Sequence, residues 1–443
     1  MPAVGPRDML ARGAATLLRS PRARRLTLLL ILAVAVLVRL VAVLLIEVDP
    51  RSHWSYDMSW YDGAARRLAK GWGYIGVDAA PTAAWPPGYP ALLAALYGVF
   101  GSSLLAAKLA NVVLAAVTVL LTYRIAYELH RPVVGLVAAA ILAVFPGYVL
   151  FAPLILSEML FVFLFCGALW LFLRLNARGR LGATSWLGLG MFLGGTSLVR
   201  GVGFFLLPVF ATTRLLEGAS WRSTSKLAVV AAAGVLLALL PWTVRNHLRL
   251  GYPILIASDG AFALYVGNSP IATGYHTLAM REPYMARFGD LIALPNPRGE
   301  VEVARAETRE ALAWMITHPH RVAALAPVKM YHMYRNDRGA GTWMREGLTK
   351  RMRPGAQRIL FRTVDGYYFA VLALALVGAR HFRPRDGDGA VALPLTVAWM
   401  TLLHAVFFFG SNRFHVPLLP ILSVMAAAEI VAWSGGRGWS AAT

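Results

Sequence analysis

A series of long apolar runs, separated by short polar gaps, limits the folds open to this chain. The first run, from Leu26 to Ile46, is long enough to cross a bilayer as a helix, which takes about 20 predominantly apolar residues. Nine further runs lie at about 104–127, 134–152, 157–175, 184–200, 202–216, 226–247, 358–379, 391–409 and 415–433. They predict an all-α polytopic membrane protein with about ten transmembrane helices.

The composition supports a membrane protein. Of the 443 residues, 58% are hydrophobic and only 15% are charged, which is too little charge for a soluble chain of this length. The net charge of +21 does not indicate nucleic-acid binding, because the basic residues fall largely in short gaps between apolar runs and not on a water-exposed face. The single cysteine, Cys166, excludes an intrachain disulfide and a Cys/His zinc cluster.

The distribution of basic residues predicts the topology. Arginines precede the first run, which is too long for a cleaved signal peptide, so we expect the N-terminus in the cytoplasm. Five segments then face the cytoplasm, most of them net basic: 128–132, 174–180, 214–226, 380–385 and the tail 434–443. Two long segments, 49–103 and 248–357, face outside. We expect a multi-pass protein of the cytoplasmic membrane, with residues 1–433 as one integral membrane domain and both termini inside.

The outer segments contain shorter predicted helices. Residues 64–69 have helical character that Gly71-Trp72-Gly73 ends, and 90–100 is too short to span. In 300–317, one face carries Val301, Ala304, Leu312 and Met315, and His318-Pro319 ends the helix. This pattern fits either an amphipathic helix on the outer membrane surface or domain mouth, or a small soluble cap packed on itself.

Charged side chains inside predicted spans need an explanation, since each costs about 2.5–3.5 kcal/mol in the hydrocarbon. Four lie toward the outer side: Arg39, Glu158, Arg200 and Arg245. Three arginines meeting at one depth would form a pocket for a lipid phosphate, because a guanidinium donates to two phosphate oxygens at once. Snorkelling to the outer headgroups accounts for Arg200 and Arg245 equally well.

Two further residues precede the last span. Arg413 and His415 could join the same pocket, although His415 by itself is better explained as an ordinary interfacial histidine. In the fifth span, Gly188, Gly190, Gly194 and Gly195 have the spacing of closely packed helices.

One carboxylate of the first outer segment differs from the others. Asp57 has aromatic neighbours that would partly desolvate it and suit it to act as a general base, whereas a loop carboxylate is usually solvated. These neighbours are Trp54, Tyr56, Trp60 and Tyr61, and the other carboxylates are Glu47, Asp49, Asp62 and Asp78.

Six motifs in order resemble one enzyme superfamily. They are Asp57-Met58-Ser59-Trp60-Tyr61 with Gly71-Trp72-Gly73-Tyr74, Pro86-Pro87-Gly88-Tyr89-Pro90, Leu156-Ser157-Glu158, Pro241-Trp242-Thr243-Val244-Arg245-Asn246, Gly267-Asn268, and Arg413-Phe414-His415-Val416-Pro417. With this order and topology the chain resembles the polyprenyl-phosphate-dependent glycosyltransferases of the GT-C fold. Within these it is similar to the bacterial relatives of protein O-mannosyltransferases (glycosyltransferase family 39) and of the lipid A aminoarabinose transferase.

The resemblance implies an inverting transfer of a sugar from a polyprenyl-monophosphate lipid to an acceptor hydroxyl on the outer face of the membrane. Asp57 would be the general base, and the candidates for binding the donor are Arg39, Tyr61, Glu158, Arg200, Arg245, Asn246, Arg413 and His415. Met58 stands where many relatives have a second acid, so a divalent metal is possible but not supported, and no other cofactor is expected. Trp85 stands where the aminoarabinose transferases have a lysine, which argues against that branch.

Two other functions compete with this one. A lipid-linked saccharide flippase would also use arginines for a phosphate, but transporters usually place charges near the midplane in repeated halves. An O-antigen-type ligase would use a diphosphate-linked donor. The sugar stays open, and so does the acceptor, which could be a glycan, a lipid or a protein.

Overall fold

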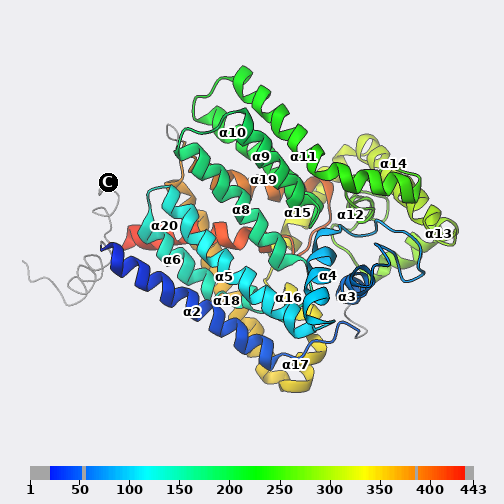
Figure 1. Ribbon diagram of the computed structural model, residues 1–443, viewed down its shortest axis with the longest axis horizontal. Coiled ribbons are helices and arrows are strands. Elements are labelled where there is room, and N and C mark those ends of the chain that lie inside the picture. The colour runs from blue at the N-terminus through cyan, green and yellow to red at the C-terminus, as the bar shows by residue number, and fades with distance from the viewer. Residues whose placement is uncertain (1–19, 52–55, 385–387, 435–443) are drawn as a thin grey trace, which may run out of the picture.

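The computed structural model describes residues 20–51, 56–384 and 388–434. Its secondary structure is helical throughout (Figure 1), and in the described residues β-type pairing is limited to two isolated bridges, Ile75 with Pro81 and Tyr275 with Gly410. The predicted all-α class is therefore confirmed. The predictions that concern the arginines before residue 20, residues 53–55 and the tail from 435 onward lie outside the described residues.

Every predicted apolar run corresponds to a helix. The helices are α2 (Pro21–Leu45), α5 (Leu104–Glu128), α6 (Pro132–Ala143) followed by the short α7 (Pro146–Val149), α8 (Glu158–Ala177), α9 (Ala183–Ser197), α10 (Leu206–Leu216) preceded by η1 (Gly201–Phe205), α11 (Trp221–Leu250), α18 (Pro354–Gly378) followed by η3 (Ala379–His381), α19 (Ala392–Phe407), and α20 (Leu419–Trp433) preceded by η4 (Val416–Leu418). Within the described ranges, six helical segments are long and apolar enough to cross a membrane alone, and they contain α2, α5, α8, α11, α18 and α20.

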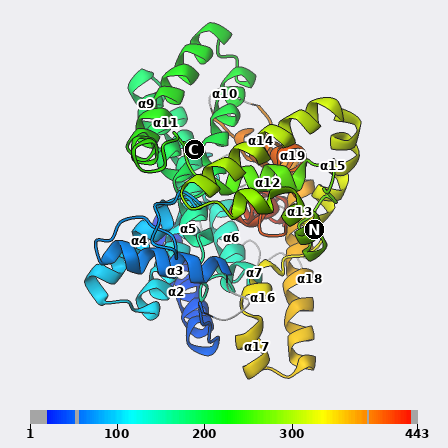
Figure 2. The same ribbon diagram turned by 90° about the vertical axis from the view of Figure 1, so that its right-hand side faces the viewer.

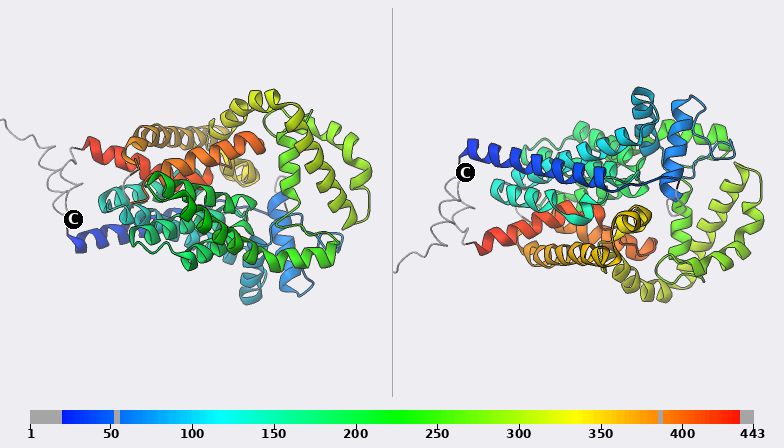
Figure 3. Two further views of the ribbon diagram at one scale, coloured as in Figure 1. Left: turned by 90° about the horizontal axis from the view of Figure 1, so that it is seen from above. Right: turned by 90° about the horizontal axis from the view of Figure 1, so that it is seen from below.

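The remaining helices gather at one end of the bundle. They are α3 (Tyr56–Ala69), α4 (Gly88–Phe100), α12 (Asp259–Gly267), η2 (Leu278–Met280), α13 (Arg281–Ile292), α14 (Arg298–Thr317), α15 (Pro319–Tyr334), α16 (Gly339–Trp343) and α17 (Arg345–Arg351). Figure 3 shows α3 and α12 to α14 at the end opposite to the start of α2 and the finish of α20. The two long polar segments therefore share one side of the molecule, as the alternation of spans requires.

The glycines of α9 allow a close approach to α11. A Cβ on Gly190 would lie 2.0 Å from the carbonyl oxygen of Ala231, and one on Gly194 would lie 2.8 Å from that of Val235. On the facing helix, a Cβ on Gly234 would lie 2.4 Å from the carbonyl oxygen of Leu187. The predicted role in helix packing is therefore confirmed for Gly190 and Gly194, whereas a Cβ at Gly188 or Gly195 would meet nothing within 4 Å.

Gly190→Ala should destabilise the bundle, because a methyl group has no room against the Ala231 carbonyl and the two helices must separate. Such overpacking costs about 1–3 kcal/mol, which thermal unfolding of the purified protein in detergent would measure. Gly188→Ala is the matched control, since a Cβ at Gly188 meets nothing within 4 Å. Equal melting temperatures for the two variants would contradict this account of the contact.

Helices α12, α13 and α14 form a unit that we call the cap. Helix α14 begins and ends close to the predicted 300–317. The predicted apolar face was only partly right: Val301 is buried, but Leu312 is 44% exposed, and Ala306 and Ala311 pack instead against Tyr265 and Phe288. The small alanine side chains let α14 approach these two rings closely. The cap is therefore packed on itself, as one reading expected, while Val303, Ala304 and Glu307 of α14 also line the large cavity described below, in keeping with the domain mouth of the other reading.

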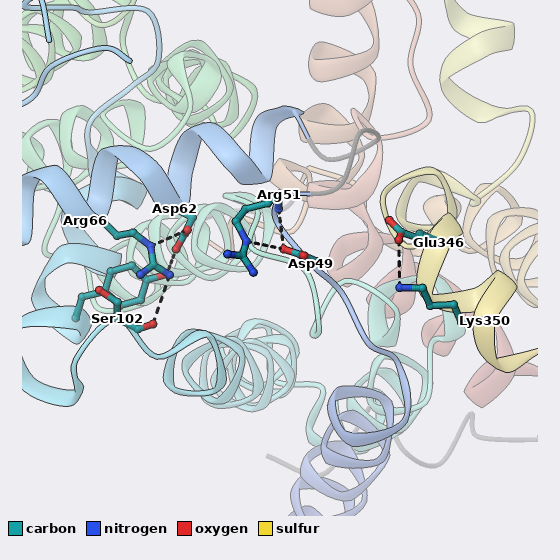
Figure 4. A network of polar contacts seen from close by, with 8 residues as sticks. Asp49, Arg51, Asp62, Arg66, Ser102, Glu346 and Lys350 are labelled. Carbon is teal, nitrogen blue, oxygen red and sulfur yellow. Dashed lines mark hydrogen bonds and ion pairs between the residues drawn. The ribbon is translucent and has the colours of Figure 1, made fainter. Parts of the chain in front are cut away.

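Helix α3 is fixed to its neighbours by one carboxylate. Asp62 is buried, its Oδ2 accepts from Arg66 Nε at 2.8 Å, and its Oδ1 accepts from the Tyr97 hydroxyl of α4 at 2.7 Å. Figure 4 shows Arg66 reaching from Asp62 toward the carbonyl of Ser102, which precedes α5. Asp62 therefore holds the first outer segment together, and this role separates it from Asp57.

The chain after α3 turns as predicted. Gly71 and Gly73 have φ angles of 76° and 88°, which a side chain would strain, so α3 ends before them. Helix α4 covers 13 residues and is too short to cross a bilayer, in agreement with the prediction for 90–100.

Candidate active site

A cavity of about 1400 Å³ lies between the two outer segments and the ends of the long helices. Its walls come from α3, residues 84–86, residues 199–205, α12, α14 and residues 404–414. In Figure 2, α3 lies on the left and α12 to α15 at the centre and right, and all of them contribute to the walls. The site therefore forms only when distant parts of the chain fold together.

Four of the predicted site residues meet at one wall. Arg413 Nη1 lies 2.8 Å from Asp57 Oδ2, and Arg413 Nε and Nη2 both lie 2.6 Å from Glu158 Oε1. Arg200 Nη1 approaches the same Glu158 oxygen at 3.2 Å. Asp57, Arg200 and Arg413 line the cavity, while Glu158 lies behind them and is 1% exposed.

Arg413 is the centre of this cluster. Burial disfavours its charged form, but the carboxylates of Glu158 and Asp57 outweigh burial and raise the pKa of Arg413 above its usual value. The guanidinium thus remains charged and orients both carboxylates. Among the described residues nothing donates a hydrogen bond to Asp57 Oδ1, so this oxygen can accept one from a ligand.

Tyr61 stands one helical turn after Asp57 on α3 and also lines the cavity. Its hydroxyl donates to Ser157 Oγ at a long 3.5 Å. Asp57 and Tyr61 therefore both contribute to the cavity wall near the ion-pair cluster.

The structure does not bring Arg39 to the cavity. Its fully buried guanidinium donates to the carbonyl oxygens of Ala143 at 2.7 Å and Leu142 at 3.2 Å, and it lies 5.2 Å from the centre of the Tyr148 ring. These carbonyls end α6, where backbone acceptors lack helical partners and the helix dipole favours a cation. These contacts explain how a charged Arg39 side chain is accommodated inside the helix bundle.

Arg245 and Asn246 hold a loop that borders the cavity. Arg245 donates to the carbonyl oxygen of Thr82 at 2.7 Å and to that of Tyr74, and Asn246 donates to Ile254 at 2.8 Å. Neither residue lines the cavity itself. Arg245 therefore positions residues 74–85, which end at the cavity wall, and Asn246 holds the segment that follows α11 at Ile254.

His415 lies behind the cavity wall. It is completely buried, with Nδ1 2.6 Å from the Met333 carbonyl oxygen and Nε2 3.0 Å from Asp337 Oδ1. These contacts join the segment that carries Arg413 to the end of α15. We therefore regard His415 as a positioning residue and not as a phosphate ligand.

Sequence reasoning missed four charged residues of the cavity, which are Asp259, Glu300, Glu307 and Arg335. Asp259 opens α12 and Glu307 lies on α14, and enclosure raises the pKa of each carboxyl to about 7. Arg335 follows α15 and pairs with no carboxylate among the described residues. A carboxylate in the turn Ser258-Asp259-Gly260, shortly before the Gly267-Asn268 motif, was the available signal for Asp259.

No group of three or more His, Cys, Asp or Glu side chains suited to a shared metal ion occurs in the part of the chain that the structure describes.

Comparisons with known structures show the fold. The Archaeoglobus fulgidus oligosaccharyltransferase in its apo form superimposes with a TM-score of 0.55 at 17% identity, covering 92% of this chain and 50% of that one. The same organism's AglB, in complex with an inhibitory peptide and a dolichol-phosphate, gives 0.53 at 17% identity, covering 91% and 50%. These similarities identify the GT-C fold.

Sequence comparisons show which enzymes the chain is similar to. A model of the dolichyl-phosphate-mannose-protein mannosyltransferase family matches residues 84–244, which contain Glu158 and Arg200 but not Asp57 or Arg413. The undecaprenyl phosphate-alpha-4-amino-4-deoxy-L-arabinose arabinosyl transferase of Pseudomonas aeruginosa is 34% identical over 156 residues, 34% of this chain and 28% of the relative. The chain is thus related to the polyprenyl-phosphate-dependent glycosyltransferases, as its motifs predict, and it matches little more than a quarter of that relative's length.

Proposed function

We propose that the protein transfers a sugar from a polyprenyl-monophosphate lipid to an acceptor hydroxyl, with inversion, on the outer face of the cytoplasmic membrane. The observation that carries the proposal is the meeting of Asp57, Arg200, Arg413 and Glu158, from four separate segments, at the wall of one large cavity. A base and a cation thereby stand at one site, which a displacement at a phosphate-linked sugar requires.

In the proposed reaction, Asp57 Oδ1 accepts the proton of the acceptor hydroxyl. The acceptor oxygen forms a bond to the anomeric carbon of the sugar, and the bond from that carbon to the phosphate oxygen breaks. The electron pair of the broken bond leaves with the polyprenyl phosphate. Asp57 supplies general-base catalysis, and the leaving phosphate needs charge stabilisation on the other side of the sugar.

Arg200 is the best candidate for binding that phosphate. Among the residues that the structure describes, Glu158 engages its Nη1 alone, so Nε and Nη2 can donate to phosphate oxygens. In Arg413, Nε and Nη2 donate to Glu158, and Nη1 donates to Asp57. Arg413 therefore acts mainly by orienting the two carboxylates, and Arg335 supplies a further cation at the cavity wall.

The apolar part of the cavity suits the lipid. Five phenylalanines line the same cavity as the polar cluster, and they are Phe205, Phe407, Phe408, Phe409 and Phe414. An isoprenoid chain next to these rings would place its phosphate near Arg200. The donor would then enter from the bilayer, with only its sugar in the water-filled part of the cavity.

Arg200→Lys should raise the KM for the lipid donor about tenfold, because lysine keeps the charge but loses the fork that donates to two oxygens. Steady-state assays with undecaprenyl-monophosphate sugars and direct binding of undecaprenyl phosphate would measure this. Arg287→Lys is the matched control, since Arg287 pairs with Glu310 on the surface of the cap. An unchanged KM in Arg200→Lys would show that Arg200 is not a phosphate ligand.

The competing functions predict different donor use. A ligase for diphosphate lipids would turn over undecaprenyl-diphosphate sugars, and a flippase would move the lipid without breaking the bond between sugar and phosphate. We expect release of undecaprenyl phosphate from monophosphate-linked sugars only. Turnover restricted to diphosphate donors, or transport without turnover, would refute the proposed function.

A further inference from the structure

A second pocket, of about 350 Å³, lies beside the large cavity. It is formed by α3, the loop 76–85 and the residues at the start of α14. Both hollows share a wall made of Tyr56, Ala84, Trp85, Asn296 and Glu300. A ligand in the smaller pocket therefore lies next to the site of the proposed reaction.

Different side chains of helix α3 line the two hollows. Asp57 and Tyr61, four residues apart, line the large cavity. Ser59, Trp60 and Arg67 line the smaller pocket. Asp57 follows Tyr56, which lines both, so the catalytic candidate stands where the two meet.

The walls of the smaller pocket combine flat aromatic rings with polar groups. The ring centres of Trp60 and Trp85 are 4.6 Å apart, and those of Tyr56 and Trp85 are 5.8 Å apart. Opposite these rings, Asn296 donates to Asp78 Oδ2 at 2.7 Å. Aromatic walls with a few convergent polar groups are typical of a small-molecule site.

Arg67 and Glu300 add charge of both signs. Arg67 Nε donates to the Ile75 carbonyl oxygen at 2.9 Å, while its buried Nη2 has no hydrogen-bond partner in the described structure. Glu300 accepts from the Thr82 hydroxyl at 2.6 Å and from the Ala83 amide at 2.9 Å, which keeps the loop against α14. The Nη2 of Arg67 is itself covered, so Arg67 offers a ligand its positive charge and not this nitrogen, and the pocket wall carries charges of both signs.

We propose that the smaller pocket binds a carbohydrate residue of the acceptor, and this inference rests on the proposed function. A sugar ring has an apolar C–H face that packs on an aromatic ring, and hydroxyl groups around its edge that both donate and accept hydrogen bonds. Trp60 and Trp85 supply the aromatic surface, and Arg67, Asp78 and Asn296 supply the polar partners. A hydroxyl pointing over the shared wall would face Asp57.

Peptide and lipid acceptors fit the pocket less well. An extended peptide would pair its backbone with a sheet edge or lie in a long groove, and the described part of this region has only the isolated bridge between Ile75 and Pro81. A lipid chain would meet the charged groups of Arg67, Asp78 and Glu300. The mixed walls and the small volume favour one or two sugar rings.

Ser59→Tyr tests the inference by filling the pocket, since Ser59 lines it and no part of the large cavity. Ala69→Tyr places the same ring on the exposed end of α3, outside both hollows, and is the matched control. Binding would be measured by saturation-transfer NMR on the full chain in detergent, without donor. The probes are the methyl glycosides of mannose, glucose, galactose, arabinose and N-acetylglucosamine, and a serine-containing peptide.

We expect at least one glycoside to bind the wild type and the control, and to bind Ser59→Tyr about tenfold or more weakly, because the introduced ring occupies its place. The slow release of undecaprenyl phosphate from a monophosphate-linked sugar to water should remain within about twofold of the wild-type rate in Ala69→Tyr, which lines neither hollow. Equal glycoside binding by Ser59→Tyr and wild type, binding of the peptide alone, or binding of no glycoside would each overturn the inference. Absence of donor turnover in the wild type would instead refute the proposed function, and the binding result would stand by itself.

Discussion

Asp57→Asn should lower the rate of sugar transfer by about 10²–10⁴-fold, the usual contribution of a general base. The amide has nearly the same shape as the carboxylate but cannot accept the proton of the acceptor hydroxyl. Arg413 would keep its contacts with Glu158, so the cavity wall should remain in place. The measurement is transfer from undecaprenyl-monophosphate sugars by the purified protein, together with its expression level and melting temperature.

A control variant and a donor-binding measurement separate loss of the base from general damage to the protein. Asp49→Asn removes a carboxylate of the same outer segment that pairs with Arg51 on the surface, and it should retain activity within about twofold. Donor binding in Asp57→Asn should persist, because Asp57 is proposed to contact the acceptor. Near-normal transfer by Asp57→Asn would refute Asp57 as the base.

Glu158→Gln should destabilise the protein by about 3–5 kcal/mol, the usual result of removing one partner from a buried ion pair. Glu158 Oε1 accepts from Arg413 and Arg200, and in the variant two guanidinium groups would face each other with Asp57 as the one remaining carboxylate of the cluster. Thermal unfolding of the full chain in detergent would show the loss. We also expect weaker transfer activity, because Asp57 and Arg200 would lose their fixed positions.

The matched control is Glu346→Gln. Glu346 pairs with Lys350 on the surface, with 46% of its side chain exposed, and removing such a pair costs about 0–1 kcal/mol. If Glu158→Gln and Glu346→Gln unfold at the same temperature, the cluster around Arg413 does not depend on Glu158 and the proposed architecture of the site is wrong.

The candidate site was predictable from the sequence in part. Asp57, Glu158, Arg200 and Arg413 were each recognisable as polar residues in or next to apolar runs, and the structure brings them together. Arg39 was equally recognisable, yet its guanidinium donates to the last carbonyl oxygens of α6 and does not reach the cavity. Hydropathy reports how deep a residue lies along the membrane normal, and it does not report the direction in which the side chain leaves the helix.

The same limit explains the residues of the cap. The sequence predicted a helix at 300–317, and α14 occupies it. Which face of that helix is buried depended on Tyr265 and Phe288, which come from α12 and α13. Glu307 and Asp259 line the cavity because the cap packs against the loop at Thr82 and Ala83, so periodicity within one helix could not indicate them.

The sequence by itself determined the class of the protein, the positions and order of its apolar runs, and the motifs that relate it to polyprenyl-phosphate-dependent glycosyltransferases. These properties follow from local patterns, because a run of apolar residues must be helical in a bilayer to satisfy its backbone. Only the tertiary structure decided that Arg413 joins Asp57 to Glu158, which lie 356 and 255 residues away from it in the chain. Such contacts arise when segments distant in sequence pack together, and no local pattern records them.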